Sequence, residues 1–227
     1  TRLQGDWSSD VCSSDLWGDG PGGQVNSLFG SPKPVRPLKT VNLPNGQITV
    51  QFSPHRANSP HEHTTNGVIA NTLSQASQSV DLALFVFTDQ GIADALQLNP
   101  SLQIRILIDR SFIYRSYSEA LDMLGLALPN HRCQYEKDNR VWKDTITTVG
   151  YPELADGDKL HHKFALLDNR QVIIGSHNWS KAANHTNDEN LLVIENTTVA
   201  QHFKREFDRL RSEERCVGKE CRSRWSP

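Results

Sequence analysis

The sequence predicts an α/β fold in which a mixed, largely buried β-sheet is flanked by helices. Several stretches are short and almost wholly apolar, the longest being LALFVF at residues 82–87. Other stretches place apolar residues at helical spacing and alternate along the chain with these runs. Strands that are buried on both faces and alternate with helices are typical of a layered α/β domain. An apolar run of this length is also too short to span a bilayer.

The elements can be assigned in chain order from their periodicity. A strand with alternating polarity is predicted at 47–52 (QITVQF), and a helical pattern follows at 65–80. The chain then predicts a buried strand at 80–87, a short helix at 91–98, a buried strand at 103–109 and a helix at 118–126. Residues 127–160 lack periodicity; Tyr135, Trp142 and Tyr151 there either belong to a segment that covers the substrate or anchor it by packing. Three strands at 161–168, 171–176 and 189–195 and a helix at 197–210 complete the pattern.

The domain itself is predicted to cover residues 46–210. Residues 6–16 (DWSSDVCSSDL) and 211–227 resemble translated sequencing adapter, so we expect 1–16 and 211–227 to carry no native fold. Residues 17–45 are rich in glycine and proline, which favours a linker. The net charge of −2 does not indicate a strongly basic nucleic-acid binder, although a local basic groove remains open. No localisation is predicted.

The stretch HHKFALLD, residues 161–168, places polar groups at the start of an apolar strand. Because residues two apart share a strand face, His161 and Lys163 point to one side, and His162 points to the other. The residues DNRQ after it predict a hairpin. A two-residue loop, Asn169 and Arg170, would place His161 opposite Asn178 and Lys163 opposite Ser176, whereas a three-residue loop would shift this pairing.

Such a cluster suits an anionic substrate better than a metal ion. A lysine can neutralise the oxygens of a phosphate but disfavours a nearby divalent cation, so no metal or other cofactor is expected. A histidine beside it can attack phosphorus, and Asn178 can donate a hydrogen bond to a phosphate oxygen. The histidine needs an acceptor on its other ring nitrogen, for which Glu189 is the nearest downstream candidate.

The pattern His161-x-Lys163-x4-Asp168, followed by Gly175-Ser176-x-Asn178 and Asn187-x-Glu189-Asn190, resembles the phospholipase D superfamily signature, the HKD motif. The resemblance covers most of residues 47–210 and implies a phospholipase D/nuclease-like α-β-α sandwich. It also implies a metal-free phosphodiesterase that forms a phosphohistidine intermediate. The catalytic residues implied are His161, Lys163, Asp168 and Glu189, with Lys163, Ser176 and Asn178 binding the substrate phosphate. Asp168 should not share the strand face of Lys163, so we expect it to have a structural or orienting role.

The resemblance leaves the substrate and the partner open. We expect a phospholipid headgroup ester, with an endonuclease or a catalytically dead binding module as alternatives. The chain contains one HKD motif, whereas this chemistry needs a second histidine as general acid. We expect the second motif to come from a missing N-terminal half, or else from the partner in a homodimer.

Overall fold

The computed structural model describes residues 30, 32–137 and 139–216. The strands are β1 (Lys39–Leu43), β2 (Gly46–Phe52), β3 (Ser79–Leu84), β4 (Gln103–Ile108), β5 (Val149–Pro152), β6 (Lys163–Leu167), β7 (Gln171–Gly175), β8 (Asn190–Glu195) and β9 (Glu214–Cys216). The helices are the 3-10 helix η2 (His61–His63) and the α-helices α2 (Thr65–Ser74), α3 (Gln90–Gln97), α4 (Arg110–Ile113), α5 (Glu119–Met123), α6 (Lys181–His185) and α7 (Thr197–Ser212).

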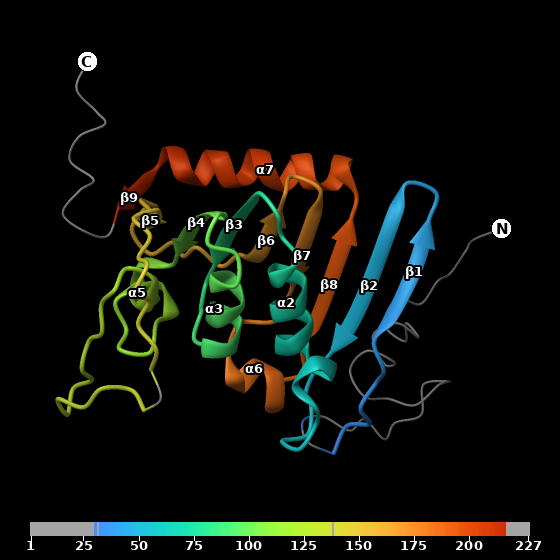
Figure 1. Ribbon diagram of the computed structural model, residues 1–227, viewed down its shortest axis with the longest axis horizontal. Coiled ribbons are helices and arrows are strands. Elements are labelled where there is room, and N and C mark those ends of the chain that lie inside the picture. The colour runs from blue at the N-terminus through green and yellow to red at the C-terminus, as the bar shows by residue number, and fades with distance from the viewer. Residues whose placement is uncertain (1–29, 31, 138, 217–227) are drawn as a thin grey trace.

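Within the described residues the strands form one nine-stranded sheet in the order β1-β2-β8-β7-β6-β3-β4-β5-β9 (Figure 1). β3, β4 and β5 run parallel to one another, and the remaining neighbours pair antiparallel. The sheet is therefore mixed, and the α/β class predicted from the sequence is confirmed.

Helices cover the two faces of the sheet (Figure 1). On one face Leu82 and Leu84 of β3 pack with the apolar residues of α2 and α3, and on the other Ala83 packs with Phe207 of α7. This division follows from the two-residue period of a strand, which sends successive side chains to opposite faces. None of the helices that the structure describes is long and apolar enough to cross a bilayer.

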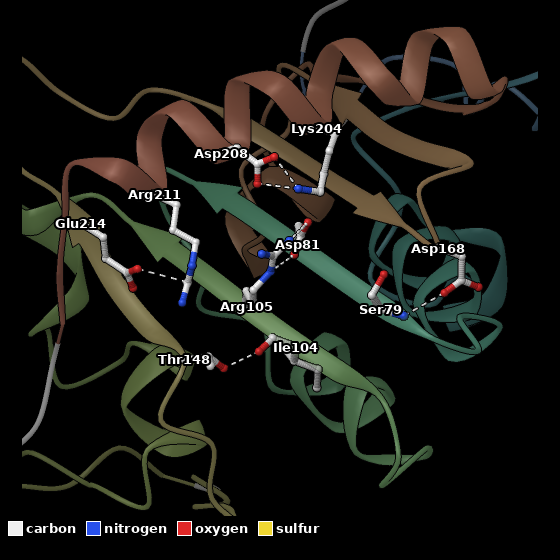
Figure 2. A network of polar contacts seen from close by, with 10 residues as sticks. All are labelled: Ser79, Asp81, Ile104, Arg105, Thr148, Asp168, Lys204, Asp208, Arg211 and Glu214. Atoms are coloured by element: carbon white, nitrogen blue, oxygen red, sulfur yellow. Dashed lines mark hydrogen bonds and ion pairs between the residues drawn. The ribbon is translucent and has the colours of Figure 1, made fainter. Parts of the chain in front are cut away.

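A buried ion pair explains why charged residues interrupt two apolar strands. Asp81 of β3 is 2% exposed and lies directly opposite Arg105 of β4. The Arg105 guanidinium donates to both Asp81 carboxylate oxygens, at 2.6 and 2.5 Å, beneath α7 (Figure 2). Such two-pronged geometry satisfies a carboxylate that would be costly to bury alone.

The structure differs from the sequence prediction at three short strands. β1 lies within the segment expected to be a linker, and β5 lies within the segment that lacks periodicity. α7 continues to Ser212, and β9 then pairs antiparallel with β5, so residues 211–216 are folded where no native fold was expected. β5 and β9 have only four and three residues, and all five residues of β1 are exposed, so none of these strands shows an apolar pattern long enough to predict it. Residues 1–29 and 217–227, which include Trp7 and Trp225, lie outside the described residues.

On one side of the sheet, which is called its edge below, strand ends from distant parts of the chain lie next to one another. From the strand directions, β2, β3, β4, β5 and β7 finish there and β6 and β8 begin there. Ligand and catalytic sites of open α/β sheets commonly lie outside such strand ends. This edge, next to α6 in Figure 1, carries the HKD residues His161 and Lys163.

Candidate active site

His161 and Lys163 lie together at this edge, where β6 begins. Lys163 pairs with Leu84 of β3, and the Phe85 backbone N–H donates to the His162 carbonyl at 2.7 Å. The Lys163 ammonium lies 3.4 Å from His161 Nε2 and donates to the His161 carbonyl at 3.0 Å. The prediction that the two side chains point to the same side is confirmed. An ammonium can only donate, so in a hydrogen bond between the two groups His161 Nε2 is the acceptor.

Phe85 forms the apolar wall behind this pair. Its ring centroid lies 4.7 Å from that of His161 and 5.3 Å from the Lys163 ammonium. Lys163 is only 8% exposed, and this burial lowers its pKa, against which the charge of Glu189 acts to raise it. A partly desolvated ammonium gains more from a bound anion than one in water does.

The hairpin that follows has a three-residue loop, not the two-residue loop of the sequence prediction. Leu167 pairs with Gln171, which leaves Asp168, Asn169 and Arg170 in the turn. Asp168 and Asn169 adopt the left-handed conformation, with φ of 50° and 53°, which Asp and Asn tolerate better than most residues. The predicted pairing of Lys163 with Ser176 and of His161 with Asn178 is therefore wrong by one residue. Ser176 and Asn178 still follow the end of β7 that lies beside the start of β6. They are not directly opposed to Lys163 and His161.

Ser176 binds to the start of β8. Its hydroxyl donates to Glu189 at 2.5 Å and accepts from the Asn190 backbone N–H at 3.1 Å. Gly175 permits this close approach, because a Cβ at that position would lie 2.1 Å from the Asn190 carbonyl oxygen. The Glu189 carboxylate also accepts from Asn187 at 3.2 Å. Glu189 thus holds the Ser176 loop, and its charge raises the pKa of Lys163. Its hydrogen bonds within the described residues are not to His161.

Asn178 follows beside the continuation of β3. The next residue, Trp179, is fully buried, its backbone N–H donates to Val86 at 3.3 Å and its carbonyl accepts from Thr88 at 2.8 Å. The Asn178 side-chain oxygen is buried and has no hydrogen-bond partner among the described residues. This oxygen can only accept, so a hydrogen bond from Asn178 to a phosphate must come from the nitrogen of the same amide.

Asp168 lies at the opposite end of β6 from His161. Its carboxylate accepts from the backbone N–H of Ser79 at 2.9 Å (Figure 2), from that of Gln78 at 2.8 Å, and from both the N–H and the hydroxyl of Ser77 at 2.9 Å. Burial alone would raise the pKa of Asp168, but these hydrogen bonds together lower it. The contacts tie the hairpin to the start of β3 and agree with the structural role considered for this residue.

Two further histidines flank the motif but face elsewhere. His162 points to α7, where its Nε2 lies 3.0 Å from Glu206. His177 is 1% exposed and contacts Thr65 of α2. Both point away from the His161 and Lys163 side chains, as the alternation of a strand predicts.

Sequence reasoning missed Asp109, which holds the segment leading to His161. One Asp109 carboxylate oxygen accepts from the Leu160 backbone N–H at 2.9 Å and the other from that of Ser111 at 2.9 Å. Its position directly after a buried strand was the available signal, since polar residues at carboxyl ends of parallel strands often line sites. Among the aromatic residues before the motif, Trp142 is 5% exposed in the core and Tyr135 is 64% exposed. Trp142 is thus a packing anchor.

Two cavities share the segment 158–160, and the second of them is lined by His161. The first, of about 370 Å³, lies between the end of β4 and residues 151–160. The second, of about 350 Å³, includes His161, His162 and Arg209. The first is lined by charges of both signs, from Arg110 and Lys159 and from Glu153, Asp156 and Asp158. This lining is not the continuous basic groove that a nucleic-acid backbone favours.

Comparisons with known proteins agree with this geometry. Residues 69–211 match the family model described as "Cardiolipin synthase, PLD-like domain". The chain is 26% identical over 190 residues to the mitochondrial cardiolipin hydrolase of Xenopus tropicalis, covering 82% of this chain and 76% of that protein. It is 29% identical over 138 residues to the phospholipase D of Rickettsia felis, covering 60% of this chain and 58% of that protein.

The fold is similar to that of two solved structures. Nuc from Salmonella typhimurium, a phospholipase D family member, superposes with a TM-score of 0.56 at 20% identity, covering 80% of this chain and 100% of that one. NucT from Helicobacter pylori gives a TM-score of 0.54 at 22% identity, covering 75% and 99%. The family match spans more than half of the chain and includes every HKD residue described above. The chain therefore belongs to the phospholipase D-like domain family and is a phosphodiesterase of the phospholipase D type.

Proposed function

We propose that this protein hydrolyses a phospholipid headgroup ester through a covalent phosphohistidine at His161. The observation that carries the proposal is the contact of His161 Nε2 with the Lys163 ammonium at the sheet edge. The lone pair that faces Lys163 is the one that attacks phosphorus once a phosphate has taken the ammonium as its partner. The His161–phosphorus bond forms as the bond to the leaving alcohol breaks, and water then hydrolyses the phosphohistidine.

Lys163 and Asn178 bind the phosphate oxygens in this proposal. Lys163 supplies a positive charge whose low exposure strengthens its attraction for an anion. Asn178 supplies the N–H groups of its side-chain amide, which donate to a phosphate oxygen. Ser176 and Glu189 hold the loop between them through their 2.5 Å hydrogen bond, and Asp168 fixes the hairpin from its far end. No metal or other cofactor takes part in the proposed reaction.

The leaving alcohol must receive a proton, which requires a second acidic group near its oxygen. We propose that a second HKD motif supplies it, either from an N-terminal half of a longer protein or from the partner in a homodimer. The present sequence contains one such motif, His161-x-Lys163-x4-Asp168.

A phospholipid is favoured over a nucleic acid by the charge around His161. The cavity at residues 151–160, next to the one lined by His161, carries Glu153, Asp156 and Asp158 as well as two cationic residues, so a polyanion would meet repulsion there. The names of the relatives, cardiolipin hydrolase and phospholipase D, support the same substrate class.

A parallel assay on lipid and nucleic acid tests the proposal. The purified chain is incubated with vesicles of cardiolipin and phosphatidylcholine, and separately with single-stranded and duplex DNA, with His161→Asn as the matched control. We expect cleavage of phospholipid by the natural sequence and none by the variant. Cleavage of DNA with all vesicles intact would instead establish the endonuclease. Unchanged lipid and DNA, both with this chain and with a longer chain that carries the second HKD motif, would establish a binding module if inorganic phosphate still binds.

A further inference from the structure

A buried polar network lies directly behind Asn178. His177, the residue between Ser176 and Asn178, points away from His161 and toward the N-terminus of α2. Its Nε2 lies 2.9 Å from the Thr65 hydroxyl, and that hydroxyl lies 2.7 Å from the side-chain oxygen of Asn184 in α6. All three side chains are at most 3% exposed. The network thus connects the Asn178 loop to two helices.

The direction of each hydrogen bond follows from the chemistry of its atoms. The Asn184 side-chain oxygen accepts from the Asn66 backbone N–H at 3.1 Å, which fixes the orientation of this amide. It can only accept, so the single hydroxyl proton of Thr65 must point to it. The Thr65 oxygen must then accept from His177, whose proton therefore lies on Nε2.

The nitrogen of the Asn184 amide determines the tautomer of a second histidine, His185. This amide nitrogen lies 3.2 Å from His185 Nε2, which must accept, so His185 carries its proton on Nδ1. That nitrogen donates to the His55 carbonyl at 3.0 Å. The hydrogen bonds therefore run in one direction, from His177 through Thr65 to the side-chain oxygen of Asn184. The Asn184 amide fixes His177 and His185 each in a single tautomer.

His177 remains neutral in this environment. Burial, with a smaller contribution from His55, lowers its pKa to about 3. Its Nδ1 is buried and has no partner among the described residues. The Thr65 hydroxyl is therefore the polar contact that determines how the His177 ring is oriented.

Asn178 has few other means of being oriented. Its side-chain oxygen has no partner among the described residues, so its direction depends on the backbone between His177 and the buried Trp179. A displacement of about 1 Å at a reacting group can cost on the order of 100-fold in rate.

We propose that Thr65 and Asn184 act through His177 as positioning residues for the phosphate-binding amide of Asn178. The inference rests on the proposed function, since it assumes that Asn178 binds phosphate. It adds two residues that lie outside the HKD signature, Asn184 of α6 and Thr65 of α2, which is more than a hundred positions earlier in the chain.

The test compares two threonines of the same helix. Thr65→Val removes the hydroxyl from the network, and Thr65→Ser keeps it. Thr72→Val is the matched control, because the Thr72 hydroxyl is also buried but donates only to the Val68 carbonyl of its own helix, at 2.7 Å. We expect Thr65→Val to lower kcat/KM by about 10- to 100-fold and Thr65→Ser by less than about threefold. Thr72→Val should keep a kcat/KM close to that of the natural sequence. It should lower the melting temperature about as much as Thr65→Val does.

Binding of inorganic phosphate, measured by calorimetry with and without Asn178→Ala, distinguishes positioning from a general loss of structure. Thr65→Val should weaken phosphate binding in the natural background and add no further weakening in the Asn178→Ala background. Equal weakening in both backgrounds, or equal loss in Thr65→Val and Thr72→Val, would overturn the inference. An ¹⁵N spectrum that places the His177 proton on Nδ1 would do the same.

The phosphate-binding role of Asn178 and the positioning role of Thr65 are tested separately. If Asn178→Ala binds phosphate and turns over as well as the natural sequence, the proposed role of Asn178 is wrong. If Asn178→Ala loses both while Thr65→Val loses neither, only the positioning network is wrong.

Discussion

The Lys163 ammonium lies 3.4 Å from His161 Nε2, on the same side of the first residues of β6. Neither side chain is an ordinary core group, because a cation in an apolar strand is costly unless something offsets its burial. An anionic substrate supplies that compensation, and it meets the histidine lone pair at the same point.

Replacing His161 should abolish hydrolysis while leaving the fold intact. His161 is exposed at the sheet edge, so His161→Ala removes the proposed nucleophile and no core packing. We expect an unchanged circular dichroism spectrum and a melting temperature close to that of the natural sequence. A variant that keeps more than about a tenth of the natural rate would exclude His161 as nucleophile.

Alkaline pH should weaken substrate binding through Lys163. Burial lowers the pKa of this residue, so its charge is lost at a lower pH than that of an exposed lysine. We expect KM to rise as the pH increases through this lowered pKa, and a bound phosphate to move the rise to higher pH. Lys163→Gln should bind weakly at all pH values without this rise; an identical alkaline rise in the variant would assign the titration to another group.

Asp168 should contribute to stability and only indirectly to turnover. Asp168→Ala leaves the N–H groups of Ser77, Gln78 and Ser79 without their acceptor, which should cost about 1–3 kcal/mol in the free energy of unfolding. Because the pKa of Asp168 is lowered in the folded state, its contribution is present above the ordinary aspartate pKa and is lost as the pH falls through the lowered value.

Urea unfolding of both proteins at neutral and acid pH measures this difference, which should shrink on acidification. Full stability of Asp168→Ala together with complete loss of turnover would mean that the residue acts in the chemistry itself.

Chelators should leave the activity unchanged. The ammonium of Lys163 lies beside His161, and its positive charge would repel a divalent cation at the same place. We expect the same rate before and after EDTA treatment. Loss of turnover that a divalent ion restores would show that the reaction needs a metal.

A mixing experiment should reveal the origin of the second histidine. The natural chain and His161→Ala are co-expressed in known ratios, so that any dimers contain both. If each site needs His161 from two copies, activity falls as the square of the natural fraction. A linear dependence would exclude the shared site and would mean that a group within one copy protonates the leaving alcohol.

Local periodicity in the sequence was enough to predict the α/β class, because the strand and helix periods of two and 3.6 residues are properties of the backbone alone. The shared side of His161 and Lys163 was predictable for the same reason, as was the opposite direction of His162 toward α7. The resemblance of the motif to the phospholipase D superfamily signature indicated phosphodiester chemistry, and the types of its polar residues indicated an anionic substrate.

The tertiary structure decided the contacts between segments that are distant in the chain. The left-handed residues Asp168 and Asn169 set the hairpin register, and the N–H groups before β3 determined where the Asp168 carboxylate lies. Glu189 binds Ser176, and His177 meets Thr65 across 112 positions. Sequence periodicity predicts the face of a strand on which a side chain lies. The residue that this side chain contacts depends on how separate strands and helices pack. That packing is a property of the whole fold, because each such contact forms only after the surrounding sheet and helices are in place.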